Sequence, residues 1–123
     1  MAEKRRILLV DDEPSLIKII HKLLTVEGYD VLVAKDGEEA LQMARSEKPD
    51  LLLLDIKLPK LDGYQVCRQL KEDPQYRQIP IIMLSALAQE HDRERGFQAG
   101  TNAYLPKPFG VQELLDKIKE FIS

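Results

Sequence analysis

The chain has 123 residues, of which 44% are hydrophobic and 32% are charged, a composition typical of a folded globular protein. Lys and Arg total 18 against 21 Asp and Glu, and the formal net charge of -3 gives no reason to expect nucleic acid or an anionic membrane surface as a partner. The length suits a single domain with one sizeable core, which we expect to span residues 1–123.

The start of the chain is basic, but it does not indicate a secretory signal. The apolar run Ile7–Val10 is too short for one and is followed directly by three acidic residues. No other apolar run approaches the length of a membrane span. The chain has one cysteine, so an intramolecular disulfide is impossible. These features favour a cytoplasmic location without a membrane partner.

Apolar runs alternate with segments of helical spacing along the chain. The runs predict strands at Ile7–Val10, Val31–Ala34, Leu51–Leu54, Ile79–Leu84 and Asn102–Leu105. The third run is the most apolar and is expected in the middle of the sheet, whereas the last is more polar and suits a sheet edge. This alternation predicts an α/β fold with a parallel, doubly wound sheet.

The helices have recognisable beginnings. Pro14 suits the first turn of the first helix. Asp36 and Glu39 resemble a capping box before the second helix, and Asp62 and Gln65 resemble one before the third. The remaining helices are expected over residues 89–99 and over an apolar stripe formed by Val111, Leu114, Leu115, Ile118 and Ile122.

Charged and hydroxyl side chains stand at the ends of the expected strands. Asp11 and Asp12 follow the first strand, Asp55 follows the third, Ser85 closes the fourth, and Lys107 lies beyond the fifth. Open parallel sheets bind ligands outside the carboxyl ends of their strands, so the three aspartates converge if strands one and three are neighbours. Converging carboxylates repel one another unless a cation joins them, and Mg²⁺ prefers oxygen ligands of this kind.

A cation site beside a lysine and a hydroxyl is, in outline, a phosphoryl-transfer site. Asp55 would serve as the nucleophile, since aspartyl-phosphates are established covalent intermediates. Ser85 and Lys107 would then bond the phosphoryl oxygens. Taken singly, Asp11 is more typical of a helix cap and Lys107 of a solvated surface. The set, in this order at successive strand ends, favours phosphoryl chemistry.

Four stretches of the sequence together resemble one known family along the whole chain. They are ILLVDDEP at residues 7–14, DLLLLDIKLPKLDGYQV at 50–66, PIIMLSA at 80–86 and AGTNAYLPKPF at 99–109. The chain resembles the receiver domain of bacterial two-component response regulators, of the type found in chemotaxis regulators. The resemblance implies a flavodoxin-like fold in which five helices flank a sheet of strand order 2-1-3-4-5.

The resemblance also implies roles for individual residues. Asp55 matches the phosphoacceptor. Asp12 matches the direct side-chain ligand of Mg²⁺, Asp11 a mostly outer ligand, and the backbone carbonyl of Lys57 completes the protein ligands.

Residues of the last two strands match the switch elements of the family. Ser85 matches the switch hydroxyl, and Tyr104 matches an aromatic side chain that changes rotamer. Lys107 matches the lysine that pairs with the phosphoryl group, and the Lys107–Pro108 bond matches a cis peptide.

The implied function is a Mg²⁺-dependent switch that takes its phosphoryl group from a sensor histidine kinase or a phosphotransfer protein. Phosphorylation would draw Ser85 inward, let Tyr104 fill the space, and bias the surface of helix four, strand five and helix five toward a downstream partner or effector domain. The chain would catalyse only its own phosphorylation and dephosphorylation. A homodimer formed on activation is compatible with this function, and direct binding of nucleic acid by this domain is not expected. Because the chain ends with the last helix, we expect no effector domain, either in a stand-alone regulator or in a domain excised from a longer one.

Two alternatives stay open. A haloacid-dehalogenase-like phosphatase also uses Mg²⁺ and an aspartyl-phosphate, but its nucleophile follows strand one in a D-x-D arrangement, where this chain has Asp11-Asp12-Glu13. A degenerate receiver module would act without phosphorylation, and the presence of the full set of site residues argues against it.

Three places depart from the family pattern. Gly110 stands where relatives often have Asp before the last helix, and Asn102-Ala103 replaces a pair that is commonly acidic. Lys57 and Leu87 occupy the variable positions at the mouth of the phosphorylation site. Leu87 cannot hydrogen-bond a water and would obstruct its approach to the phosphorus, so we expect a long-lived phosphorylated form.

Overall fold

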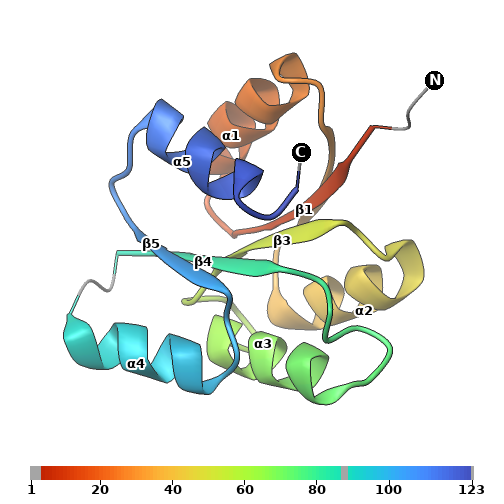
Figure 1. Ribbon diagram of the computed structural model, residues 1–123, viewed down its shortest axis with the longest axis vertical. Helices are drawn as coiled ribbons and strands as arrows, with labels where there is room; N and C mark the ends of the chain where they lie inside the picture. Colours follow the sequence, from red (N-terminus) through yellow and green to blue (C-terminus); the bar gives the residue numbers. More distant parts are fainter. Residues whose placement is uncertain (1–3, 87–88, 123) are drawn as a thin grey trace.

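The computed structural model describes residues 4–86 and 89–122, in which strands and helices alternate (Figure 1). The strands are β1 (Arg6–Val10), β2 (Asp30–Ala34), β3 (Leu51–Asp55), β4 (Ile81–Ser85) and β5 (Ala103–Pro106). The helices are α1 (Pro14–Val26), α2 (Gly37–Glu47), α3 (Gly63–Glu72), α4 (Glu90–Gln98) and α5 (Val111–Lys119). The strands form one parallel sheet in the order β2-β1-β3-β4-β5. This topology confirms the predicted α/β, doubly wound, flavodoxin-like fold.

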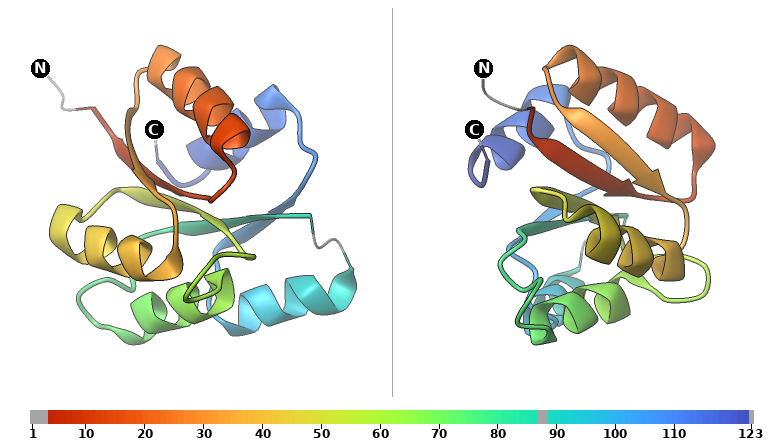
Figure 2. Two further views of the ribbon diagram at one scale, coloured as in Figure 1. Left: turned by 180° about the vertical axis from the view of Figure 1, so that it is seen from behind. Right: turned by 90° about the vertical axis from the view of Figure 1, so that its right-hand side faces the viewer.

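Helices cover both faces of the sheet, with α1 and α5 on one side and α2, α3 and α4 on the other (Figures 1 and 2). Strand residues alternate between two cores. In β3, Leu52 and Leu54 pack with α2 and α3, whereas Leu51 and Leu53 pack with α1 and α5. Every residue of β3 is buried, which confirms its predicted place in the middle of the sheet. None of the described helices is both long and apolar enough to span a membrane.

The last two strands differ in detail from the prediction. The fourth begins at Ile81, not at Ile79, because Pro80 has no N–H for a ladder; the Pro80 carbonyl still accepts a hydrogen bond from Leu52 N at 2.9 Å. The fifth lies at the sheet edge as predicted, but it begins at Ala103 and so leaves out the polar Asn102; its Ala103, Tyr104 and Leu105 are buried. Asn102 precedes that strand, and its side-chain carbonyl accepts from Ile81 N at 2.9 Å.

The helix starts confirm most of the predicted caps. Asp62 and Gln65 form a reciprocal capping box. At the second helix only half of the predicted box is present: the Asp36 carboxylate accepts from Glu39 N, but the Glu39 carboxylate accepts from Lys35 N instead of from the cap residue.

The last helix begins as its sequence suggested, with one exception on its apolar stripe. Gly110 is the N-cap of α5, and its N–H donates to Glu113 at 3.3 Å. Val111 was expected on the buried stripe, but it is 56% exposed at the first position of the helix. Leu114 and Ile118 are buried.

Helix α4 packs on the rest of the molecule without a large buried apolar side chain of its own. Its buried residues are Asp92 and Gly96. The Tyr64 hydroxyl on α3 donates to the Asp92 backbone carbonyl at 3.2 Å, and the Arg95 guanidinium lies 4.2 Å from the centre of the Tyr64 ring. A side chain at Gly96 would approach Met83 Sδ to 3.0 Å, so glycine allows the helix to lie close to the sheet.

Candidate functional site

Three carboxylates meet at the carboxyl ends of β1 and β3. Val10 pairs with Leu54 in the parallel ladder, so Asp11 and Asp55 come next on neighbouring strands. Asp11, Asp12 and Asp55 each bring an oxygen to within 4.8 Å of the others. Asp11 is 1% exposed and Asp55 is 7% exposed, whereas Asp12 is exposed. The three aspartates therefore converge, as expected once β1 and β3 are neighbours.

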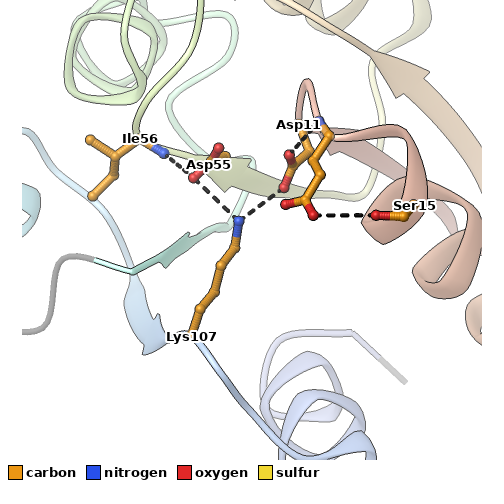
Figure 3. A network of polar contacts seen from close by, with 6 residues as sticks. Asp11, Ser15, Asp55, Ile56 and Lys107 are labelled. Atoms are coloured by element: carbon orange, nitrogen blue, oxygen red, sulfur yellow. Dashed lines mark hydrogen bonds and ion pairs between the residues drawn. The ribbon is translucent and has the colours of Figure 1, made fainter.

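Lys107 reaches this cluster from the end of β5, as Figure 3 shows. Its Nζ lies 3.1 Å from Asp11 Oδ2 and 3.5 Å from Asp55 Oδ1. Its backbone N–H donates to the Ser85 carbonyl at 2.6 Å, and the Lys107–Pro108 peptide bond is cis. The lysine therefore bridges two buried carboxylates that would otherwise repel each other.

The Asp55 carboxylate is held in a fixed orientation, and its burial disfavours the charged form. Its Oδ1 accepts a hydrogen bond from the Ile56 N–H at 2.9 Å (Figure 3). Burial raises the pKa of Asp55, the Lys107 ammonium opposes this rise, and the Asp11 carboxylate adds to it. A carboxylate in this setting favours additional positive charge nearby.

Asp11 is fixed by backbone contacts on both sides. Its N–H donates to the Ala34 carbonyl at 3.1 Å, and its Oδ1 accepts from Glu13 N at 3.0 Å in a local turn. With Oδ2 paired to Lys107, both oxygens of Asp11 have partners. Asp12, by contrast, is the exposed member of the cluster.

Ser85 and Tyr104 lie on the neighbouring strands β4 and β5. Asp55 pairs with Leu84, so Ser85 is one residue further toward the same end of the sheet, and it is 1% exposed. Tyr104 is 5% exposed. Burial raises the pKa of the Tyr104 hydroxyl, and its hydrogen bond with the Ser85 side chain lowers it. The two residues assigned to the switch are therefore in direct contact.

Of the two residues expected at the mouth of the site, the described part of the chain includes one, Lys57. Lys57 is exposed and lies in the loop between β3 and α3. Leu87 lies outside the described residues. The expectation of a long-lived phosphorylated form stays a prediction.

Two further residues shape the site that the sequence did not single out. Ile56 contributes only its backbone N–H, which no side-chain pattern reveals. The Gly63 N–H donates to the Ile56 carbonyl at 2.8 Å, and a Cβ on Gly63 would overlap the Asp55 carbonyl oxygen. A glycine inside the first turn of a helix, where most residues are better helix formers, was the available signal.

The donors of this cluster fit a hard divalent cation. They are carboxylate oxygens only, with one exposed member, and Mg²⁺ is commonly held by one or two carboxylates together with water and phosphate oxygens.

Comparisons with known proteins agree with this geometry. Residues 7–119 match the family described as the response regulator receiver domain. The chain is 45% identical over 118 residues to the alkaline phosphatase synthesis transcriptional regulatory protein PhoP of Bacillus subtilis, covering 96% of this chain and 48% of PhoP. It thus spans about half the length of the curated relatives that it matches.

Solved structures of similar size have the same fold. The receiver domain of the sensor histidine kinase PA1611 from Pseudomonas aeruginosa, described with a magnesium ion coordinated in its active-site cleft, matches with a TM-score of 0.90 and 39% identity over 98% of both chains. The phosphorylated cyanobacterial phytochrome response regulator RcpA matches with a TM-score of 0.81 and 31% identity, covering 96% of this chain and 91% of the other. The fold, the acidic cluster with its lysine, and these relatives together place the chain in the family of response regulator receiver domains.

Proposed function

We propose that the chain is a phosphorylation switch in which Asp55 takes a phosphoryl group from the phosphohistidine of a sensor kinase or phosphotransfer protein. The observation that carries this proposal is the buried Asp55 carboxylate, oriented by Ile56 N–H and bridged to Asp11 by Lys107 at the carboxyl ends of the strands. Receiver domains act in two-component signalling, and the proposal assigns that activity to particular atoms.

The transfer step forms one bond and breaks one. An Asp55 carboxylate oxygen attacks the phosphorus, the new O–P bond forms as the N–P bond of the donor breaks, and the bond electrons go to the ring nitrogen. The donor ring carries a proton on its other nitrogen and leaves as neutral imidazole. In the dephosphorylation step, water attacks the phosphorus, the O–P bond to Asp55 breaks, the Asp55 carboxylate is restored, and inorganic phosphate leaves.

Two side chains are placed to bond the phosphoryl oxygens. Lys107 Nζ is already 3.5 Å from Asp55 Oδ1, so a small rearrangement brings it to a phosphoryl oxygen and offsets charge during transfer. Ser85 stands one strand away at the same end of the sheet, in contact with Tyr104. A Ser85 hydroxyl drawn to the phosphoryl group would leave Tyr104, which links the chemistry to β5 and α4.

The acidic cluster would hold Mg²⁺, with Asp12 and Asp55 as direct carboxylate ligands, the Lys57 carbonyl as a backbone ligand, and Asp11 further out. Both Asp11 oxygens already have partners, which supports this division between Asp11 and Asp12. When bound, the ion would neutralise part of the negative charge shared by the carboxylates and the phosphoryl group.

The signal would leave through the surface of α4, β5 and α5 to a downstream protein or an attached effector domain. Relatives such as PhoP are named as transcriptional regulators and are about twice as long as this chain, so nucleic acid would be contacted by other parts of such proteins. We further propose that the chain catalyses only its own phosphorylation and dephosphorylation. The cytoplasmic location and a homodimer formed on activation stay predictions.

Acetyl phosphate tests the function directly. Incubation with Mg²⁺ should add one phosphoryl group to the intact protein, stable in acid and labile in alkali, and EDTA should prevent the addition. Steady turnover of small phosphate esters would instead support the phosphatase alternative. No modification, together with no binding of beryllofluoride, would support the degenerate module.

Replacing Asp12 with Ala should raise the melting temperature in metal-free buffer, because it removes one of three mutually repelling carboxylates. The native protein should gain stability from millimolar Mg²⁺, since the ion binds the folded cluster and not the unfolded chain. The variant should lose most of that gain. Thermal denaturation with and without Mg²⁺ measures both effects, and a native melting temperature indifferent to Mg²⁺ would contradict the proposed metal site.

A further inference from the structure

The loop between β3 and α3, residues 56–62, is closed by hydrogen bonds at two levels. At its base, Gly63 N donates to the Ile56 carbonyl at 2.8 Å. At its tip, Gly37 N, in the first turn of α2, donates to the Pro59 carbonyl at 3.2 Å. Lys57 lies between these two contacts, so its backbone is held from both sides.

The tip of this loop is a strained turn. Leu61 N donates to the Pro59 carbonyl at 2.8 Å, and the residue between them, Lys60, has a φ of 71°. A three-residue turn with positive φ at its centre is rare and strained for a residue with a side chain. Such a conformation persists only where the surrounding structure enforces it.

The start of helix α2 holds the turn in this conformation. A Cβ on Gly37 would overlap the carbonyl oxygen and the side chain of Leu61, so only glycine lets the helix start rest directly on the turn. The Lys60 ammonium adds two weak ion pairs to the same helix start, 3.7 Å from Asp36 Oδ2 and 3.9 Å from Glu38 Oε2.

We propose that Gly37 and Lys60 are positioning residues for the metal site: the contact between α2 and the strained turn fixes the Lys57 carbonyl for coordination. The inference rests on the proposed function, because it takes Mg²⁺ as the ligand of the acidic cluster. A backbone carbonyl has no rotamer of its own, so its position depends wholly on how the loop is held. A loop ordered during folding has less conformational entropy left to lose when the ion binds.

The first test compares two glycine-to-alanine variants at helix starts. Gly37→Ala should weaken Mg²⁺ binding about tenfold, the usual effect of disturbing the groups that support metal ligands. Gly110→Ala is the matched control, since a Cβ there meets nothing within 4 Å and its affinity should equal the native one. Calorimetric titration of the unphosphorylated proteins with MgCl₂ measures the affinities. Native affinity in a folded Gly37→Ala protein would overturn the inference.

The second variant, Lys60→Gly, separates positioning from stability and serves if Gly37→Ala does not fold. Glycine adopts positive φ without strain, so the metal-free melting temperature should hold or rise. The turn also gains freedom, so Mg²⁺ affinity should fall by roughly fivefold, part of the ordering entropy of one residue. Hydrogen exchange of the Gly37 amide should accelerate at the same time. The inference would be overturned if the Mg²⁺ affinity of Lys60→Gly were unchanged, or if it rose or fell together with the melting temperature. No Mg²⁺ binding by the native protein would refute the proposed metal site itself.

Discussion

Replacing Asp55 with Asn should abolish phosphorylation by acetyl phosphate and leave the fold intact. The amide is nearly isosteric and can still accept the Ile56 N–H bond, but its oxygen is not a nucleophile. Removing a covalent nucleophile costs ~10³-fold or more in rate. Intact-protein mass spectrometry after incubation with the donor and Mg²⁺ measures the modification.

A matched control comes from Asp50, the residue directly before the same strand. Asp50 accepts a hydrogen bond from Arg6 N at 2.8 Å, so Asp50→Asn makes the same chemical change away from the acidic cluster. It should be phosphorylated as fast as the native protein. Full labelling of the Asp55→Asn protein on another residue would refute the assignment of the acceptor.

Replacing Lys107 with Met should lower the metal-free free energy of unfolding by ~2 kcal/mol. The change leaves Asp11 and Asp55, both buried, without the cation that bridges them. The loss is smaller than for a fully enclosed pair because the lysine side chain is 19% exposed. Saturating Mg²⁺ should recover much of the difference, since the ion would supply positive charge at the same carboxylates.

Urea denaturation in EDTA and in Mg²⁺ measures the two free energies. Lys117→Met is the control, because Lys117 pairs with Glu120 on the surface of α5 and its loss should change stability by less than ~0.5 kcal/mol. Equal stability of the Lys107→Met and native proteins in EDTA would show that the bridge contributes nothing.

Most of the fold followed from periodicity. The continuous apolar run Leu51–Leu54 predicted a central strand because a strand covered on both faces has no polar side. The predicted start of the fourth strand was wrong, because an apolar residue there lies next to a proline. Ile79 is apolar and buried like the residues of β4, but Pro80 cannot join the ladder, so hydrophobicity alone placed the strand start too early.

Part of the candidate site could be predicted from the sequence, and part could not. The convergence of Asp11 and Asp55 could be predicted because parallel strands bring their carboxyl ends to one edge. The contribution of Ile56 could not, since it is made by a backbone N–H, and a glycine in the first turn of α2 or α3 indicates a close contact without showing which segment makes it. Close approach between distant segments leaves no periodic signal in a sequence.

The residues that α4 buries affect the free energy needed to move this helix. With Asp92 and Gly96 as its buried residues, α4 withdraws no large apolar side chain of its own from the core when it shifts, although it uncovers part of Met83 and Tyr104 beneath Gly96. Displacing an apolar helix such as α5 would in addition withdraw Leu114, Leu115 and Ile118 from the core, so moving α4 costs less free energy than moving α5. A local event at the strand ends would therefore need a smaller free-energy change to move α4 than to move α5.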